Sequence, residues 1–428
     1  MKQYPHVKDS GVQWLGDVPA HWQVAQYKQL VDIQNGSDHK HVEAEEGFPV
    51  IGSGGVFAFA SDYLYDGESV LLGRKGTIDK PLYVTGKFWA VDTMYWTKIA
   101  SDAYGKFAYY AALNIPFEHY STNTALPSMT KRALSSHAVA RPPLHEQVVI
   151  ATFLDRETSK IDNLITAQRK LIDLLAEKKQ SLISHAVTKG LNPDVPMKDS
   201  GVPQVGAVPE HWDVARLKFV AQIQTGIAKG KDVSGRSTVQ APYLRVANVQ
   251  DGFLDLENIA TIDVEANQLE RYKLQPGDVL MNEGGDYDKL GRGAVWHGEI
   301  DGCIHQNHVF AVRPRAIEPE WITRFAASNS GKFYFMQMSK QSTNLASISS
   351  SNLMELPISV PPEKERTEIL NWLSREISKL EKLQTRTTAA IDFLVERRSA
   401  LISAAVTGKI DVRDLVQAPQ EQQAMESA

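Results

Sequence analysis

Two internal repeats lie at different offsets in this chain of 428 residues. Residues 8–36 match residues 198–226 at 16 of 29 positions, an offset of 190. Residues 142–188 match residues 361–407 at 21 of 47 positions, an offset of 219. Average residue usage gives about two chance matches in a segment like the first. The chain therefore carries one plan twice, and the blocks between the repeats differ in length by 219 − 190 = 29 residues.

Each copy opens on the sequence Val-Pro-x-His-Trp, at Val18–Trp22 and again at Val208–Trp212. Tryptophan has a large apolar body and one N–H donor, so a repeated tryptophan suits a buried joint better than a reactive site. We expect the tryptophans to pack, and the histidines to hydrogen bond, where each variable domain meets a helix.

The second repeat predicts two long helices. Each copy follows two prolines and then runs for more than forty residues without Pro or Gly. Alternate steps of four and three residues pass mostly through apolar side chains, which is the heptad pattern of a coiled coil. The predicted helix-pairing residues are Ile150, Leu154, Ile161, Leu164, Leu171, Leu175 and Leu182 in the first helix, and Ile369, Leu373, Leu380, Leu383, Leu394 and Leu401 in the second.

The predicted fold class is α+β, with two mixed α/β domains separated by two long antiparallel coiled-coil helices in a pseudo-two-fold internal repeat. The alternative is that each amphipathic helix packs only on its own domain. The predicted boundaries are 1–142 for the first domain, 143–190 for the first helix, 191–361 for the second domain, 362–411 for the second helix and 412–428 for a disordered tail.

Composition narrows the class of protein. Hydrophobic content of 43% and charged content of 23% are ordinary for a globular chain, and the apolar runs are too short to cross a bilayer. The single cysteine, Cys303, excludes an internal disulfide framework; with no secretory signal visible, it favours a cytoplasmic location. A net charge of −5 argues against non-specific nucleic-acid binding but leaves room for a local basic surface.

The variable blocks contain β-rich runs and glycine turns but no catalytic motif. Gly52–Gly55 lacks the spacing of a dinucleotide-binding loop, and Asn114–Phe117 lacks the second proline of an adenine methyltransferase motif. On a strand, Cys303 and His305 share one face while His308 lies on the other, which argues against a metal site. We therefore expect neither catalysis nor a bound metal.

Polar and basic loop residues are candidate contacts to DNA. Arg74 and Lys75 lie between glycines, which let a backbone approach a phosphate closely; the alternative is a solvated hairpin turn. The run His305–His308 offers hydrogen-bonding groups for base edges; the alternative is a set of buried structural side chains. The candidate DNA-binding residues are Arg74, Lys75, Thr77, Lys229, Lys231, Arg236, Arg245, Asn248, Lys289, Arg292, His305, Gln306, Asn307, His308, Ser342 and Asn344.

The doubled opener, the Pro-Pro-led helices with Leu-His-Glu-Gln at 144–147, and the Ala-Val-Thr endings resemble the specificity subunit of type I restriction-modification enzymes. The stretch 277–314, with GDVLMNEGG, GRGAVW and HQNHVFAVRP, resembles a target recognition domain of that family. In one departure, Glu363-Lys-Glu-Arg366 stands at the second helix start, so the two starts need not contact a partner equally.

This resemblance implies a DNA-recognition subunit rather than an enzyme. Two target recognition domains would each read one half of a split, asymmetric sequence, and the paired helices would set the gap. The implied partners are double-stranded DNA, two methyltransferase subunits and two restriction subunits, with no membrane. S-adenosylmethionine, ATP and Mg²⁺ would belong to those subunits, and this chain would hold no cofactor. A coiled-coil scaffold and a stand-alone DNA methyltransferase are the alternatives.

Overall fold

The computed structural model describes residues 2–120, 127–230, 236–285, 290–291, 293–341 and 346–415. The chain divides into two compact units. The first consists of Met1–Arg169 with Thr388–Ala428, and the second is Lys170–Thr387. Each unit therefore contains one mixed α/β domain together with a segment of each long helix.

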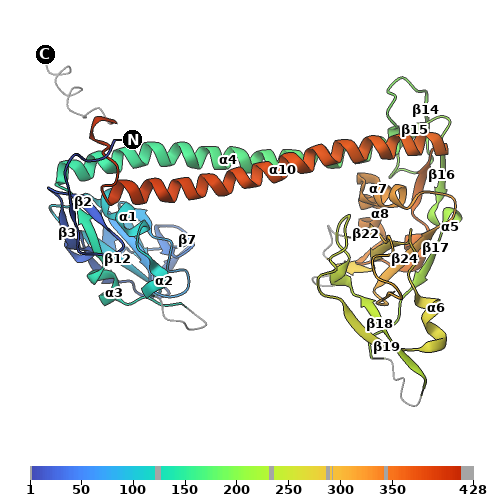
Figure 1. The fold of residues 1–428 in the computed structure, drawn as a ribbon, viewed down its shortest axis with the longest axis horizontal. Coiled ribbons are helices and arrows are strands. Elements are labelled where there is room, and N and C mark those ends of the chain that lie inside the picture. Colours follow the sequence, from blue (N-terminus) through green and yellow to red (C-terminus); the bar gives the residue numbers. More distant parts are fainter. Residues whose placement is uncertain are drawn as a thin grey trace. The chain divides into compact units, whose positions relative to one another are not determined.

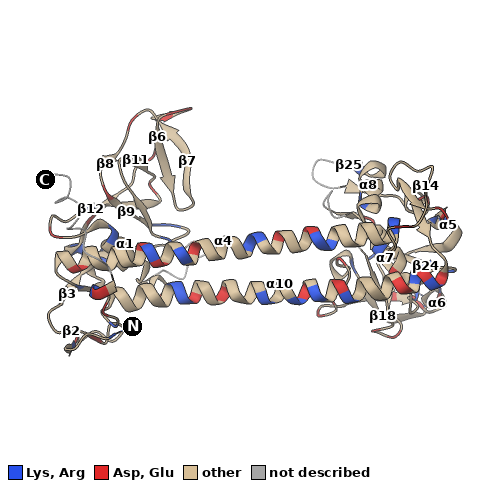
Figure 2. Cartoon of the chain, turned by 90° about the horizontal axis from the view of Figure 1, so that it is seen from above, with Lys and Arg blue, Asp and Glu red and all other residues tan. Residues whose placement is uncertain are grey.

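The two long helices are α4, Leu144–Lys189, and α10, Glu363–Val406 (Figure 1). Glycines with positive φ follow both, Gly190 at 76° and Gly408 at 73°, a conformation that glycine adopts at helix ends without strain. Acidic and basic side chains are interspersed along both helices (Figure 2), which suits a solvated outer surface.

Within each unit the two helix segments run antiparallel and contact each other. In the first unit, Arg398 Nε donates to Asp162 Oδ1 at 2.9 Å; in the second, Lys179 Nζ donates to Glu381 Oε1 at 2.8 Å. The helix ends also join the domain cores, as shown by buried Leu154 in the first. The helices thus pack both on each other and on their domains, and the predicted antiparallel pair is confirmed.

The helix seam differs from the predicted stripe at three positions. Leu164, Leu171 and Leu383 are 51%, 42% and 48% exposed, so the prediction that they pair the helices is wrong. The seam passes instead through the next residue along the first helix, where Ile165 is only 8% exposed. Apolar residues stand at both 164 and 165, so the periodicity alone did not separate the seam from its flank.

The other predicted seam residues form two sets that differ in how deeply their side chains are buried. Fully buried are Ile150, Leu154, Ile161, Ile369 and Leu373. Half-buried are Leu175, Leu182, Leu380, Leu394 and Leu401. Burial is therefore greatest where a helix end lies against a domain.

The domain of the first unit is built on two larger sheets, and two-stranded sheets of β1 with β2 and of β3 with β13 lie beside them in its described part. A four-stranded antiparallel sheet has the order β10-β9-β12-β4, and a five-stranded sheet has the order β5-β7-β6-β11-β8 with β11 parallel to β6. The bounds are β1 Val7–Asp9, β2 Asp17–Pro19, β3 Gln23–Gln26, β4 Val31–Asn35, β5 Glu43–Ala44, β6 Phe48–Gly52, β7 Gly55–Ala60, β8 Tyr65–Asp66, β9 Ser69–Gly73, β10 Leu82–Val84, β11 Lys87–Ala90, β12 Met94–Ile99, α1 Gly105–Leu113, α2 Phe117–Tyr120, α3 Lys131–Ser136 and β13 Ala138–Arg141.

The domain of the second unit repeats this plan. Its four-stranded antiparallel sheet has the order β17-β24-β20-β22, and β18 runs parallel to β23 in a neighbouring sheet. The bounds are β14 Met197–Asp199, β15 Ala207–Pro209, β16 Asp213–Arg216, α5 Leu217–Val220, β17 Ala221–Thr225, β18 Thr238–Leu244, β19 Ala260–Glu265, α6 Leu269–Tyr272, β20 Val279–Asn282, β21 Gly284–Gly285, β22 Gly293–Val295, β23 Ile304–His305, β24 Val309–Pro314, α7 Pro319–Ala327, α8 Asn329–Met338, β25 Lys340–Gln341, β26 Ala346–Ser347, α9 Ser350–Met354 and β27 Pro357–Val360.

The two openers form the predicted joints. Trp22 Nε1 donates to Glu146 on the first turn of α4 at 3.0 Å, and Trp212 Nε1 donates to Glu365 on the first turn of α10 at 3.1 Å. His21 contacts the same Glu146 carboxylate at 2.6 Å. These tryptophans are fully buried, so the repeated His-Trp pair is framework, as the sequence predicts.

No helix in the described part of the chain combines the length and the apolar character needed to cross a lipid bilayer.

Candidate nucleic-acid interface

Two loops with the same backbone geometry lie at equivalent places in the two domains. Residues 91–93 connect β11 to β12, and residues 306–308 connect β23 to β24. The Met94 N–H donates to Val91 O, and the Val309 N–H donates to Gln306 O, both at 2.9 Å. The side chains differ, since Val-Asp-Thr in the first loop corresponds to Gln-Asn-His in the second.

A glycine passes close behind each loop. A Cβ on Gly36 would lie 2.0 Å from Val91 O, and a Cβ on Gly226 would lie 2.1 Å from His305 O. Only glycine fits such an approach, which explains why these glycines belong to the repeated framework. The loops are therefore held alike by repeated residues while their own side chains are free to differ.

The predicted Arg74-Lys75 turn lies directly beside the first loop. The Arg74 N–H donates to Thr93 O at 2.9 Å, and its Nη1 donates to Asp92 O at 3.3 Å. Its guanidinium also lies 5.8 Å from the centre of the Tyr95 ring. Lys75 and Thr77 are exposed. The turn therefore presents fixed positive charge next to Asp92 and Thr93.

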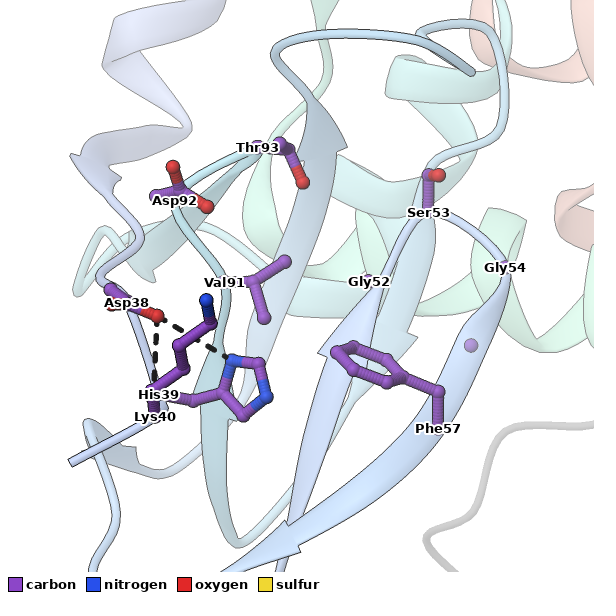
Figure 3. Close-up of a pocket in the computed structure, with 11 residues that line it drawn as sticks. Asp38, His39, Lys40, Gly52, Ser53, Gly54, Phe57, Val91, Asp92 and Thr93 are labelled. Carbon is purple, nitrogen blue, oxygen red and sulfur yellow. Dashed lines mark hydrogen bonds and ion pairs between the residues drawn. The ribbon is translucent and has the colours of Figure 1, made fainter. Parts of the chain in front are cut away.

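A groove of about 510 Å³ opens beside this turn in the first domain (Figure 3). Its apolar part contains Phe57, Val91 and the glycines of the β6–β7 turn. Around it lie polar side chains from three chain segments. They are Asp38, His39, Lys40, Ser53, Asp92 and Thr93.

In the second domain, the equivalent loop presents imidazole and amide groups. His308 Nδ1 lies 2.6 Å from Glu283 Oε2, and its side chain is 56% exposed. Asn307 Nδ2 lies 3.3 Å from His308 Nε2. Gln306 Oε1 accepts the Val246 N–H at 3.3 Å. Asn307 and His308 are thus positioned by neighbours while remaining accessible.

Two predicted DNA contacts lie in the interior of the second domain instead. His305 is fully buried; its Nδ1 donates to Val309 O at 2.7 Å, and burial lowers its pKa. Asn248 is 3% exposed, and its Oδ1 accepts the Arg245 N–H at 2.8 Å. The prediction that these two residues contact bases is therefore wrong, because neither side chain reaches the surface. Both stabilise the loops instead.

The remaining candidates fall into two groups. Lys229 is exposed, Arg236 is paired with Glu265, and Arg245 Nη2 donates to Asn258 O at 2.9 Å. The other five lie outside the described residues. They are Lys231, Lys289, Arg292, Ser342 and Asn344.

Sequence reasoning missed Asp92, Thr93 and Phe57. The loop 91–93 shares no residue with 306–308, so the residues of the loops themselves do not show their equivalence. Phe57 on β7 reaches the same groove because β7 pairs with β6, and β6 pairs with β11 across nearly forty residues of chain. The detectable signal was Gly36, whose repeat at Gly226 marks the backbone behind each loop.

Among the described residues, no group of three or more His, Cys, Asp or Glu side chains is placed to hold a metal ion. Cys303 is buried, and burial raises the pKa of its thiol to about 12. This cysteine therefore stays protonated at neutral pH.

Duplicated α/β domains that carry different residues on equivalent loops define a class of two-site recognition proteins. The family model described as type I restriction modification DNA specificity domain matches residues 19–173 and 209–391. This chain belongs to that family and carries two copies of its domain.

Curated relatives share low identity with this chain. The EcoBI specificity subunit of Escherichia coli is 20% identical over 428 residues, covering 94% of this chain and 89% of the relative. The MjaVIII specificity subunit of Methanocaldococcus jannaschii is 24% identical, with coverage of 82% and 79%. Matches to the MjaX and EcoKI specificity subunits span only 40% and 57% of those relatives.

One solved chain has a similar fold. It comes from a structural study of complex assembly and conformational transition of the type I R-M system. The TM-score is 0.70 at 14% sequence identity, covering 92% of this chain and 99% of that chain. At this identity the likeness concerns the fold.

Proposed function

We propose that this chain is the non-catalytic DNA-recognition subunit of a type I restriction-modification complex. Residues 1–142 and 191–361 are the two target recognition domains, and each reads one half of a bipartite, asymmetric DNA sequence. Residues 143–190 and 362–411 are the helices that set the gap. The observation that carries the proposal is the pair of equivalent loops, 91–93 and 306–308, which combine one backbone geometry with different side chains.

The chemistry of these loops suits base edges. A carboxylate such as Asp92 accepts from the amino group of cytosine or adenine, and an amide such as Asn307 makes the paired hydrogen bonds that adenine offers. Arg74, Lys75 and Lys229 supply positive charge at or near the loops, where phosphate contacts fix the position of the protein on DNA.

The outer faces of the helices suit protein partners. Leu164, Leu171 and Leu383 are exposed leucines on otherwise charged helices, and such side chains favour burial against another subunit. We assign these faces to two methyltransferase subunits, which bring S-adenosylmethionine. Two restriction subunits complete the complex with ATP and Mg²⁺. A cytoplasmic location follows from a DNA target.

Methylation-sensitive sequencing of DNA from cells that carry this chain and its methyltransferase partner tests the proposal. We expect a split motif with two different halves, and Arg74→Ala should weaken recognition of one half only. Equal loss in both halves contradicts modular reading. Methylation by the purified chain with S-adenosylmethionine alone would establish a stand-alone methyltransferase instead. Absence of any sequence-dependent binding with the partner present would favour a scaffold.

A further inference from the structure

The groove of the first domain has an apolar floor that is open to solvent. Phe57 lies on β7 with 60% of its surface exposed, although phenylalanine is normally buried. Figure 3 shows its ring turned toward Gly52 and Val91. His39 holds the ring edge-to-face, with the ring centres 5.3 Å apart. The contact with His39 therefore fixes the orientation of the exposed Phe57 ring.

Gly52 makes room on this floor. A Cβ at position 52 would lie 3.3 Å from a ring carbon of Phe57 and 3.8 Å from Val91 Cγ2. Any side chain there would enter the space between the phenyl ring and the valine. The missing side chain thus lets the Phe57 ring lie close over Gly52 and Val91, and the exposed apolar surface of the floor belongs mainly to that ring.

The rim supplies polar groups of complementary kinds. Asp92 is exposed and offers a carboxylate acceptor, while Ser53 and Lys40 offer hydrogen-bond donors. Arg74 lies just behind Asp92 and supplies positive charge. The lining itself carries two carboxylates, Asp38 and Asp92, and one lysine, Lys40, so the positive charge available for a DNA backbone comes mainly from the Arg74–Lys75 turn beside the groove.

We propose that this groove reads a T·A base pair in the major groove of DNA, with the thymine 5-methyl group on Phe57 and Val91. The inference rests on the proposed function and adds to it the base that the first domain recognises. In the major groove, a T·A pair presents the methyl group, the thymine O4 acceptor and the adenine N6 donor side by side. The apolar floor takes the methyl group, Ser53 or Lys40 donates to O4, and Asp92 accepts from N6.

The other base pairs fit this groove less well. Cytosine offers an amino donor to Asp92 but has no methyl group for the floor, and guanine presents two acceptors and no apolar group. The second domain has Gln306 where the first has Val91, so that position of the equivalent surface is polar. Dependence on a thymine methyl group is therefore specific to the half-site read by the first domain.

Deoxyuridine substitution in synthetic duplexes tests the inference, because it removes only the methyl group. The intact complex of this chain with its methyltransferase partner is titrated with duplexes that carry the sequenced target. Replacing one thymidine of the first half-site by deoxyuridine should weaken binding about fourfold, the value for one buried methyl group. The same replacement in the second half-site should change binding by less than about twofold.

Two variants locate the effect in the groove. Phe57→Ala and Gly52→Ala should each reduce the ratio between thymidine and deoxyuridine affinities from about four to about one. Val56→Ala is the matched control, since Val56 is the exposed neighbour of Phe57 on β7 but does not line the groove, and the ratio should stay near four.

The outcomes separate the two proposals. Equal binding of thymidine and deoxyuridine duplexes by the wild-type complex overturns the inference and leaves the proposed function standing, and so does a first half-site without thymine. Loss of the ratio in Val56→Ala while Phe57→Ala keeps it would place the methyl group elsewhere and would also overturn it. If the wild-type complex shows no preference for any sequence, the proposed function itself fails.

Discussion

The two joints where the long helices begin share one set of contacts but differ in depth. At the first joint, Glu146 accepts from Tyr4, His21 and Trp22, and its side chain is 3% exposed. At the second, Glu365 accepts from His211 and Trp212, and its side chain is 28% exposed. Duplication has preserved the carboxylate–tryptophan bond, while the surrounding residues determine how much water reaches it.

The residue that follows each glutamate shows how the copies diverged together. Gln147 Nε2 donates to Pro142 O, and its Oε1 accepts the N–H of Tyr104, which precedes α1. In the second joint, Arg366 Nη1 donates to Pro361 O, and its Nε donates to Glu318, which precedes α7. Where glutamine became arginine, its partner changed from a backbone N–H to a carboxylate. The polar groups of each joint therefore keep a hydrogen-bond partner.

Replacing the joint carboxylates should give the largest effect and should separate the two copies. Glu146→Ala leaves the donors of Tyr4 and Trp22 without their acceptor in a closed interior, and it removes the carboxylate partner of the half-exposed His21. We expect a loss of about 3 kcal/mol in the free energy of unfolding of the first unit. Glu365→Ala should cost the second unit about 1–2 kcal/mol, because water reaches that site. Native-state hydrogen exchange of amides in β3 and β16 measures the two units separately.

The matched isostere is the control for this comparison. Glu146→Gln keeps the shape and one acceptor oxygen, so its cost should lie between zero and that of the alanine variant. Equal losses for Glu146→Ala and Glu365→Ala would mean that the difference in exposure has no energetic consequence.

The helix seam offers the next largest effect. Ile165 is 8% exposed, whereas its neighbour Leu164 is 51% exposed. Ile165→Ala should lower the free energy of unfolding of the first unit by about 2–3 kcal/mol through a cavity. Leu164→Ala should change it by less than about 0.5 kcal/mol. Denaturant unfolding of the two variants, each compared with the wild type, measures the difference, and the reverse ranking would restore the heptad stripe predicted from sequence.

A double-mutant cycle on the second joint should give a smaller effect. Arg366 and Glu318 form an ion pair at 2.6 Å, with side-chain exposures of 9% and 27%. We expect a coupling free energy of about 1.5–2 kcal/mol between Arg366→Gln and Glu318→Gln in denaturant unfolding. In the first unit, Gln147→Arg should destabilise, because the equivalent partner there is a backbone N–H rather than a carboxylate. A coupling near zero would show that the two changes are independent.

These comparisons also show what the sequence could predict. Repeats, proline starts and the absence of Gly and Pro predicted α4 and α10, because helix length and period are local properties. The adjacent apolar pair Leu164 and Ile165 left the seam ambiguous, since either residue continues a heptad. The sequence also did not decide whether His305 is buried, because a polar residue in a β-rich stretch faces either the core or the solvent.

The candidate site was harder to predict than the fold. Arg74 was visible as a basic residue between glycines, and the structure places it beside Asp92. Phe57 was not, because it reaches the groove through pairing of β6 with β11, a long-range contact that no local pattern encodes. The topology shared by the two domains is carried by strand order rather than by residue identity, so sequence comparison of the variable blocks did not reveal it.

Lowering the pH should change the free energy of unfolding of the two units differently, by less than the substitutions above. His137 in the first unit and Leu356 in the second are equivalent, because their carbonyls accept the N–H groups of Tyr27 and Leu217. Burial lowers the pKa of His137 to about 4, and Tyr120 Oη lies 2.9 Å from its Nδ1. The unfolded chain binds this proton near pH 6.5, so between pH 6.5 and 4 the unfolded state takes up more protons than the folded state.

The free energy of unfolding of the first unit should therefore be greatest above pH 6.5 and decrease as the pH falls toward 4. The contribution of His137 is a loss of about 1 kcal/mol at pH 5.5. His137→Leu, which installs the residue of the second unit, should remove that part of the slope. Trp14 stacks on His137 with ring centres 5.5 Å apart, so its fluorescence reports the local change. An unchanged slope in His137→Leu would assign the acid sensitivity to other groups and leave the two units alike in this respect.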